Sequence, residues 1–460
     1  MNLKTENNNA EIISLKMESD VLKSITYTST KGKLWISLLL LIFIAGIIAY
    51  GIQLKNGLIV TSMRNYVSWG LYISMFIFFI GISHVGALMS SILRLTGAEW
   101  RFPITRMAEA ITFSSLLFAG IMPILDMGRP DRLLFLITHG RIQSPILWDI
   151  IAIATYFVGS TIYLYLPMIP DIAMLRDKLN HASKWRIKIY RVLAVGWKGT
   201  DLQKQLLEKC MNIMTAIILP VAISVHTVVA WLLAMTLRTG WNSTILGPYF
   251  VSGAIMSGAA AVLIAMAIFR KTYNLEQYIT NVHFKKLSLL LFVLTLIYTY
   301  FNINEYGVPA YKMEKAESEY LNELFSGTHA PLYWSVQILG LLVPLILLAL
   351  KRIRNSISWI VFASSLIVVG AMVKRYIIVI PTMLHPFVPI QNAPLSYSSY
   401  FPSIIEWLVT LGAMAGFMLV YTLFSKLFPI ITLWETADAI KNHGEESVGV
   451  ALKIPSTVSN

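Results

Sequence analysis

The sequence is poor in cysteine, and this excludes several kinds of site. One cysteine among 460 residues, Cys210, excludes a disulfide framework and any cysteine-rich metal or iron–sulfur site. No CxxCH motif occurs, so a covalently attached c-type haem is excluded as well. We therefore predict no metal site, no haem and no iron–sulfur cluster on this chain.

The sequence is also poor in charge. Charged residues make up 13% of the chain, about half of the roughly 25% found in soluble proteins, while 56% of the residues are hydrophobic. This balance is typical of a protein that crosses a bilayer several times, because its lipid-facing surface must be apolar. Residues 1–33 lack the basic start and short apolar core of a cleaved signal peptide.

Long hydrophobic runs are what the chain has in abundance. A spanning helix needs about 20 mostly apolar residues, and ten runs meet this requirement. We predict an all-α polytopic membrane protein with about ten transmembrane helices in residues 34–428, between a segment 1–33 and a tail 429–460. The second to fifth runs, and the sixth to ninth, would form two four-helix bundles with single flanking helices. The runs are 34–53, 66–94, 104–125, 146–168, 206–236, 248–270, 284–303, 331–350, 357–381 and 402–428.

Basic residues orient the chain. The loops 94–106, 169–205, 270–286 and 351–354 are rich in lysine and arginine, and a ten-span model places all four on one side. The opposite loop 304–330 is acidic. Because cytoplasmic loops carry an excess of Lys and Arg, both termini are predicted to face the cytoplasm. The net charge of +13 therefore reflects these loops and gives no reason to expect a nucleic-acid partner.

Few charged or titratable residues lie inside the runs. A charge at a helix centre costs about 2.5–3.5 kcal/mol on insertion scales, so such residues usually face a bundle interior or a wet cavity. They are candidates for function, although a buried packing role is the alternative for each. The residues are His84, Glu109, Asp149, His226, Lys374, Arg375 and Glu406.

Two carboxylates lie at the outer ends of consecutive runs. Asp126 follows a long apolar run in IMPILDMGRPDR, and Asp149 lies just inside the next run in SPILWDI. Asp149 could simply sit at a helix N-terminus, where the macrodipole stabilises a carboxylate. Asp126 could simply lie at a C-terminal helix end that turns through Gly128 and Pro130. Together they could instead converge on one pocket as proton acceptors. Arg129 and Arg132 could pair with them or with an anionic partner.

The two intramembrane histidines allow two interpretations. His84 lies among small residues in GISHVGALMSS, which indicates tight helix packing. His226 could be a haem ligand, but a b-type haem usually needs a second deep histidine. His84 and His226 could pair in this way, although no spacing signature supports it.

The other intramembrane charges call for partners. Glu109 lies three residues after Arg106, a spacing that favours an ion pair on one helix face. Lys374 and Arg375 lie near the outer end of the ninth run, and Asp149 is a candidate counter-ion for them.

Several motifs resemble one membrane-protein family. GISHVGALMSSILRL, the GRPDR turn and SPILWDI resemble the NrfD/PsrC family of quinone-interacting membrane subunits, and the likeness extends from about residue 60 to 428. The ten-span form is more similar to ActC subunits of alternative complex III. This resemblance implies a quinone or quinol in the first four-helix bundle, near the outer side. It also implies a peripheral iron–sulfur partner, further membrane subunits such as a second chain of this family, and a prokaryotic cytoplasmic membrane.

The resemblance also implies roles for individual residues. Asp149 corresponds to the aspartate of the family's WD motif, and Trp148 precedes it. The ActC pattern has a histidine where this chain has Asp126, whereas the DMGRP turn with Arg129 is more similar to the shorter NrfD-type members. The residues implied in proton passage are His84, Glu109, His226 and Arg375.

The predicted function is therefore a quinone-binding membrane subunit of a multisubunit respiratory oxidoreductase. It exchanges electrons between the quinone pool and a peripheral iron–sulfur subunit. Asp149 and Asp126 are the predicted proton-exchanging groups, with coupling to proton translocation as an open extension. A secondary transporter and a purely structural membrane anchor are the alternatives.

Overall fold

The computed structural model describes residues 16–179, 183–388, 390–444 and 448–450. The outer parts of the predicted terminal segments, 1–15 and 451–460, lie outside these ranges. Regular secondary structure in the described residues is helical, apart from one isolated bridge between Arg238 and Pro386. Ten helical segments there are long and apolar enough to cross a bilayer, so the prediction of an all-α polytopic membrane protein is confirmed.

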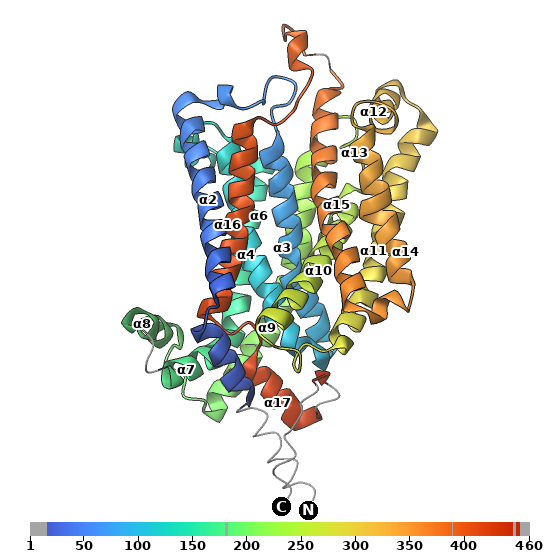
Figure 1. Cartoon of the computed structure of the whole chain (residues 1–460). Helices are drawn as coiled ribbons and strands as arrows, with labels where there is room; N and C mark the ends of the chain where they lie inside the picture. The colour runs from blue at the N-terminus through green and yellow to red at the C-terminus, as the bar shows by residue number, and fades with distance from the viewer. Residues whose placement is uncertain (1–15, 180–182, 389, 445–447, 451–460) are drawn as a thin grey trace, which may run out of the picture.

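The spanning segments follow one another up and down through the molecule (Figure 1). They are α2 (Thr30–Asn56), α3 (Leu71–Leu95), α4 (Phe102–Asp126), α6 (Pro145–Tyr165), α9 (Asp201–Ala234), α10 (Leu246–Thr272), α11 (Asn281–Lys312), α13 (Ala330–Ser335) continuing through a π-helical turn η5 (Val336–Leu342) into α14 (Val343–Ala349), α15 (Ile357–Leu384) and α16 (Ile404–Leu427).

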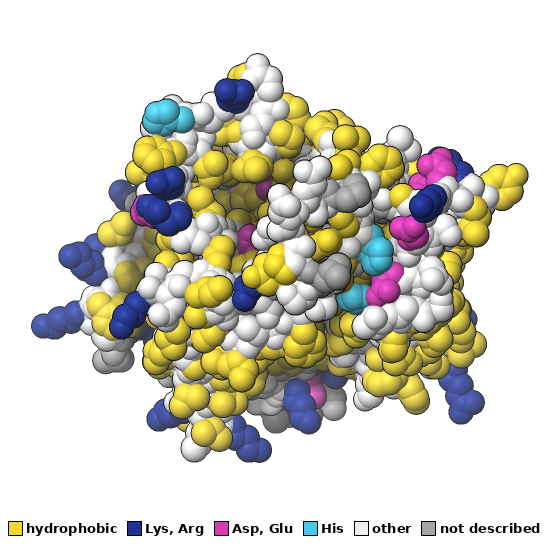
Figure 2. Space-filling view, turned by 90° about the horizontal axis from the view of Figure 1, so that it is seen from above, with side chains coloured by type: hydrophobic (Ala, Val, Ile, Leu, Met, Phe, Trp, Pro, Cys, Tyr) yellow, Lys and Arg dark blue, Asp and Glu magenta, His cyan; other side chains and the backbone are white. Residues whose placement is uncertain are grey.

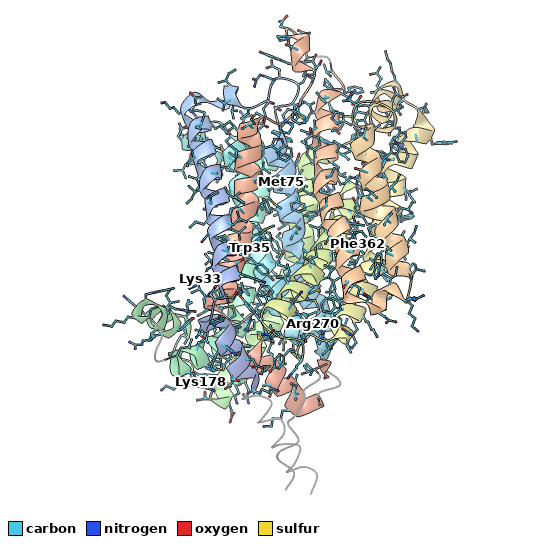
Figure 3. The ribbon with its side chains drawn as sticks, viewed as in Figure 1. Lys33, Trp35, Met75, Lys178, Arg270 and Phe362 are labelled. Carbon is cyan, nitrogen blue, oxygen red and sulfur yellow. The ribbon has the colours of Figure 1, made fainter. Side chains whose placement is uncertain are left out.

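Shorter helices cover the two ends. They are α5 (Phe135–Thr138), α7 (Ile169–Lys178), α8 (Lys184–Leu193), α12 (Lys315–Phe325) and α17 (Leu433–His443), with 3-10 turns η1 (Leu58–Val60), η2 (Glu99–Arg101), η3 (Pro130–Arg132), η4 (Leu166–Met168), η6 (Ile353–Asn355) and η7 (Leu395–Tyr397). Helices α7, α8 and α17 lie at the lower end of Figure 1, and α12 lies at the upper end. Lys33, Lys178 and Arg270 also lie at the lower end (Figure 3). The predicted cytoplasmic basic loops thus share one end, although which compartment that end faces stays a prediction.

Two four-helix bundles form the body, as predicted. Helices α3, α4, α6 and α9 pack around one another, and α10, α11, α14 and α15 form the second group. The bundles join where α3 packs against α10 and α15. The two remaining spans, α2 and α16, pack tightly against each other, and α16 also contacts α4 and α3 (Figure 1). Both flanking helices therefore lie together beside the first bundle.

Helix α3 is the centre of the molecule and is almost completely buried. Its contact with α4 depends on Gly86, whose N–H donates to Thr112 Oγ1 at 2.9 Å. A Cβ at this position would lie 2.7 Å from the carbonyl oxygen of Ala108, so only glycine fits without a shift. Small residues allow transmembrane helices to approach closely, because association inside a bilayer relies on packing.

Helix ends depart from the predicted runs where polar residues continue the helix. Helix α11 extends to Lys312, nine residues beyond the predicted end at 303, so part of the acidic segment 304–330 is helical. Helix α9 begins at Asp201 because Thr200 and Gln203 form a capping box there. Hydrophobicity marks the part of a helix in contact with lipid, whereas capping and hydrogen bonding decide where the helix itself begins and ends.

A buried ion pair fastens α17 across the lower end. Arg106 Nη1 on α4 lies 2.5 Å from Asp171 Oδ2 on α7. The same carboxylate accepts the backbone N–H groups of Leu433 and Trp434, each at 3.1 Å, at the start of α17. Asp171 thereby satisfies N–H groups that have no partner within their own helix.

Candidate functional site

Two carboxylates, each with one buried oxygen that has no hydrogen-bond partner in the described part of the chain, lie at the upper end of the first bundle. Asp149 is the fifth residue of α6 and is buried, and Asp126 is the last residue of α4. Helices α4 and α6 pack against each other. In the described residues, the buried Oδ1 atom of each carboxylate has no hydrogen-bond partner. Buried polar atoms are usually paired, so two such atoms at one end mark a candidate site.

The upper face is hollowed at this end of the molecule. Figure 2 shows two acidic side chains set back inside a depression whose walls are mostly hydrophobic, with basic side chains near its edge. A hydrophobic depression with a few polar groups at its base is the usual form of a small-molecule site.

The position of Asp149 on α6 bears on its two interpretations. The buried polar residues of α6 are Asp149, Tyr156, Ser160 and Tyr163, whose spacing of seven, four and three places them on one helix face. Among the described residues, no hydrogen bond joins the Asp149 carboxylate to the backbone at the start of α6. Asp149 therefore faces the bundle interior and does not act as a helix cap.

A polar network adjoins Asp126. Tyr72 OH donates to Gln53 Oε1 at 2.7 Å, and Gln53 Nε2 donates to the carbonyl oxygen of Leu125 at 2.8 Å. These bonds tie α2, α3 and α4 together beside the carboxylate. Asp126 also interacts electrostatically with Glu406.

Glu406 shows what a structural carboxylate looks like in this protein. It caps α16 by accepting the N–H of Ser403 at 2.9 Å, and it also accepts the N–H of Ser62 at 2.8 Å and the hydroxyl of Tyr400 at 2.5 Å. All these partners lie at the upper end, where they connect the start of α16 to the chain before α3. Both carboxylate oxygens of Glu406 thus accept hydrogen bonds that stabilise the fold, unlike the buried Oδ1 atoms of Asp126 and Asp149.

The predicted quinone-binding residues Arg129 and Trp148 lie close in sequence to the two carboxylates, three residues after Asp126 and directly before Asp149. Arg129 is exposed and pairs with Asp131, with 2.9 Å between Nη2 and Oδ2. The suggested pairing of Arg129 with Asp126 or Asp149 is therefore wrong in this structure. Trp148 is partly buried, and its Nε1 donates to the carbonyl oxygen of Ile142.

The middle of the first bundle contains a stacked group of rings. The rings of His84 and His226 lie 4.5 Å apart, and Tyr156 stacks on His84 at 4.9 Å. His84 Nδ1 lies 2.6 Å from the carbonyl oxygen of Ile80, and its Nε2 lies 2.9 Å from that of Ala222. A neutral imidazole can donate to only one of these oxygens, whereas a protonated ring can donate to both.

The direct contact between the two histidines bears on the haem alternative. The rings meet edge to face, so they do not stand on opposite sides of a porphyrin in this arrangement. Neither ring nitrogen of His226 has a hydrogen-bond partner among the described residues. The prediction that the chain carries no haem remains a prediction.

Arg375 lies at the seam between the bundles. A Cβ at Gly253 on α10 would lie 3.2 Å from Arg375 Nη2, and one at Gly81 on α3 would lie 3.7 Å from it. The guanidinium also lies over the ring of Phe250, 5.3 Å from its centroid, and the ring of His226 lies 5.9 Å from that of Phe250. Arg375 is thus close to the histidine group of the first bundle.

Lys374 belongs to the second bundle. Its ammonium donates to Asn302 Oδ1 at 3.3 Å and to the hydroxyl of Tyr306, both on α11. No ion pair joins Lys374 or Arg375 to Asp149 in the described part of the chain. The predicted counter-ion role of Asp149 is therefore wrong, because α6 and α15 lie in different bundles.

Glu109 lies near the lower end of α4, and its predicted ion pair with Arg106 is not formed. Arg106 points to Asp171 instead, and the buried Oε2 atom of Glu109 has no partner among the described residues. Glu435 on α17 lies at the same end, 3.5 Å from Arg94. Burial raises the pKa of the Glu435 carboxyl, while Arg101 and Arg94 oppose this effect.

Sequence reasoning missed the tyrosines and amides of this interior. Tyr156 completes the ring group of the first bundle, and Asn302 with Tyr306 surrounds the lysine of the second. Asn302 lies at the end of the predicted apolar run and Tyr306 lies just beyond it, but their four-residue spacing was a usable signal for a shared helix face. Tyrosine has both polar and apolar parts, so its presence in an apolar run gives little indication of function.

Comparison with known proteins identifies the family of this chain. A family model described as "Polysulphide reductase, NrfD" matches residues 59–386. The chain belongs to the NrfD family. The family prediction is thus confirmed, while the nearer likeness to ActC subunits stays a prediction.

Several relatives of this NrfD-family chain carry names of reductase subunits. A selenate reductase subunit of Mesobacillus selenatarsenatis is 24% identical over 436 residues, covering 92% of this chain and 99% of that protein. The menaquinone reductase integral membrane subunit of Nitratidesulfovibrio vulgaris is 22% identical over 408 residues, covering 87% and 92%. A Halobacterium salinarum protein, provisionally named as a membrane subunit of a dimethyl sulfoxide reductase, is 31% identical over 237 residues. That alignment spans about half of each chain, 51% of both.

Proposed function

We propose that this chain is the quinone-binding membrane subunit of a multisubunit oxidoreductase. The quinone headgroup would bind in the hollow at the upper end of the first bundle, between Asp149 and Asp126. The observation that carries this proposal is the buried carboxylate of Asp149 on the inward face of α6, whose Oδ1 atom has no hydrogen-bond partner among the described residues. The name of the menaquinone reductase relative supports a quinone as the ligand.

The residues suit the chemistry of a quinol. Oxidation of a quinol releases two electrons and two protons, and a nearby carboxylate can accept a proton from a ring hydroxyl. Asp149 Oδ1 has a free lone pair for such a hydrogen bond, and Asp126 offers a second acceptor at the same end. Arg129 and Trp148 would border the entrance.

The electrons need a partner. One cysteine cannot hold an iron–sulfur cluster, so this chain must pass electrons to a cofactor on another subunit. We propose a peripheral iron–sulfur subunit at the upper end, next to the quinone hollow, with further membrane subunits such as a second chain of this family. The complex would lie in a prokaryotic cytoplasmic membrane with both termini of this chain in the cytoplasm.

A proton route through the first bundle is a further part of the proposal. His84 and His226 lie in ring contact at its centre, and Arg375 lies near them. Glu109 lies below them, towards the lower end, with an unpartnered carboxylate oxygen. These groups could pass protons between the quinone site and the lower side. The histidines and Glu109 can gain and lose a proton, and the positive charge of Arg375 can orient their hydrogen bonds.

Replacement of Asp149 tests the quinone site. We expect Asp149→Asn to assemble with its partner subunits and to lose about a hundredfold or more in quinone-linked turnover, the usual cost of losing an acid–base group. Asp126→Asn should have a smaller effect, because ActC-like proteins have a different residue there. The measurement is turnover with a soluble quinol analogue, with co-purifying subunits identified by mass spectrometry.

The control is Asp131→Asn, which removes an exposed carboxylate at the same end of the molecule. It should leave turnover unchanged. Wild-type turnover in an assembled Asp149→Asn complex would place the site elsewhere. If no quinone analogue binds to the wild-type complex, a transporter or a structural anchor becomes the better interpretation.

A further inference from the structure

Helix α8 (Lys184–Leu193) lies outside the ten spans, at the side of the molecule near the start of α2 (Figure 1). Its position is set by hydrogen bonds to the end of span α16. Tyr190 OH donates to the carbonyl oxygen of Leu427 at 2.7 Å, and Arg186 Nη2 donates to that of Lys426 at 2.6 Å. Because α16 ends at Leu427, these bonds hold α8 at the level where the spans leave the membrane.

A second span end also holds α8. Tyr165, the last residue of α6, donates its hydroxyl to the carbonyl oxygen of Leu193 at 2.6 Å. The ring of Tyr190 also packs against Phe428, with 6.3 Å between ring centroids. The orientation of α8 is therefore fixed by contacts with the ends of two different spans.

One stripe of α8 is apolar and uncovered. Trp185, Ile189 and Val192 are 55%, 38% and 67% exposed. Their spacing of four and three residues places them on a single helix face, away from the buried Tyr190. We call these three residues the apolar stripe. The described part of the chain thus leaves much of a tryptophan and of two branched aliphatic side chains uncovered, so the apolar stripe is free to contact lipid.

A second stripe of α8 is basic. Lys184, Lys188 and Arg191 are all exposed and follow the same spacing of four and three residues. At about 100° per residue, this basic stripe lies next to the apolar stripe and also away from the protein. Lys33 at the lower end of α2 adds positive charge at the same end of the molecule (Figure 3).

We propose that α8 is an interfacial helix that binds anionic phospholipid. The apolar stripe would enter the boundary between headgroups and acyl chains, and the basic stripe would bind the anionic headgroups. Amphipathic helices with a tryptophan on one face and Lys or Arg on another bind membranes in this way. The hydrogen bonds to the ends of α6 and α16 place α8 at the depth that this role requires.

The charge of the basic stripe selects the lipid. Each Lys or Arg near a membrane surface raises the affinity for anionic over neutral lipid about fivefold. The reason is that the positive charge attracts an anionic headgroup, whereas a zwitterionic headgroup has no net charge. Exposed surface charges are screened by salt, so the preference should decline as ionic strength rises. The apolar lipid-facing side chains of spans α2, α6 and α16 do not distinguish anionic from neutral headgroups, so substitution of the basic stripe measures the contribution of α8.

Site-specific quenching tests the proposal on the full chain. A fluorophore is attached at Val192→Cys in a Cys210→Ser background, and the protein is placed in phosphatidylcholine nanodiscs. Brominated phosphatidylcholine or brominated phosphatidylglycerol is then added at equal mole fraction. We expect both lipids to quench the fluorophore, and phosphatidylglycerol to quench it more strongly.

Charge removal provides the decisive comparison. The triple variant Lys184→Gln, Lys188→Gln and Arg191→Gln should lower the preference for phosphatidylglycerol by roughly fivefold for each charge removed, until both lipids quench equally. A matched control removes three exposed lysines of the same basic loop and the adjoining start of α9, which lie outside α8, and should keep the preference. Its substitutions are Lys198→Gln, Lys204→Gln and Lys209→Gln.

A second probe position guards against misfolding. A fluorophore at Leu41→Cys, on a side chain of α2 that is 66% exposed among the apolar residues of a span, should be quenched equally in all variants. If the probe at 192 stays unquenched while that at 41 is quenched, the apolar stripe faces water or a protein and the proposal is overturned. Equal quenching by both lipids in the wild type, or an equal loss of preference in the control variant, would overturn the anionic selectivity.

Discussion

Replacement of Asp171 by asparagine should release α17 from the lower end of the molecule. The Asp171 carboxylate lies 2.5 Å from Arg106 Nη1, and the two side chains are 2% and 0% exposed. Asparagine has nearly the same size but no charge, so the substitution leaves a buried guanidinium without a counter-ion. It also weakens the acceptor for the backbone N–H groups of Leu433 and Trp434.

The structure sets the magnitude of this effect. Removal of one partner of a buried ion pair usually costs about 3–5 kcal/mol. Arg106 keeps hydrogen bonds to the carbonyl oxygens of Pro167 at 2.9 Å and Ile431 at 3.2 Å, which partly stabilise its charge. The lower value is therefore expected, about 3 kcal/mol, which corresponds to a factor of roughly a hundred in the docking equilibrium of α17.

Limited proteolysis of the native full chain measures this equilibrium. Lys441 is an exposed tryptic site inside α17, and cleavage there requires the helix to open. When opening and closing are fast relative to cleavage, the cleavage rate follows the population of the open form. We expect cleavage at Lys441 to accelerate by up to about a hundredfold in Asp171→Asn.

A control on the same helix isolates the effect of burial. Asp177→Asn makes the same chemical change six residues later, in an ion pair with Arg176, where the aspartate side chain is 62% exposed. Exposed pairs contribute about 0–1 kcal/mol, so cleavage should change little. Wild-type cleavage in Asp171→Asn would refute the reasoning. The double variant Arg106→Met with Asp171→Leu should be cleaved more slowly than Asp171→Asn, because it leaves no buried charge.

Three further predictions concern packing, pH and topology. Gly86→Ala should destabilise the α3–α4 contact by about 1–3 kcal/mol, measured by thermal unfolding. Gly51→Ala is the control, because a Cβ added at Gly51 meets no atom within 4 Å. Equal unfolding midpoints for the two variants would contradict the packing argument. Burial raises the pKa of the Glu435 carboxyl, so the folded protein retains a proton that the unfolded chain releases, and its contribution to stability falls as pH rises through that range. Glu435→Gln should flatten the dependence of unfolding on pH between mildly acidic and neutral conditions, and an unchanged slope would argue against this carboxyl as the source. In a cysteine-free background, an impermeant thiol reagent outside intact cells should label Ala316→Cys and should not label Lys198→Cys, and the reverse pattern would invert the predicted topology.

The number and order of the spans could be read from the sequence because the bilayer imposes a one-dimensional requirement. About 20 consecutive apolar residues are needed to cross it, and this signal is local. The locations of Asp126 and Asp149 at the ends of consecutive spans could also be predicted, since a carboxylate at the end of an apolar run can be recognised from the sequence however the helices pack. The boundaries of α9 and α11 were missed because polar residues continue these helices beyond the lipid.

The partners of the buried charges were decided by the tertiary structure alone. Arg106 could be paired with Glu109 from their spacing, yet its partner is Asp171, 65 residues away on α7. Lys374 bonds to α11, 68 residues away at Tyr306, and not to Asp149. A local pattern shows that a buried charge needs a partner, but it cannot show which distant helix provides one, because that depends on how all ten helices pack.

The sequence by itself therefore determined the membrane class, the ten spans and the residues whose burial would be costly. The tertiary structure decided which of those residues are satisfied: Glu406 accepts hydrogen bonds from Ser62, Tyr400 and Ser403, while one buried oxygen of Asp149 and one of Asp126 have no partner in the described part of the chain. The physical reason is that the desolvation cost of a carboxylate depends on its type and depth, whereas its compensation depends on donors brought from elsewhere in the fold.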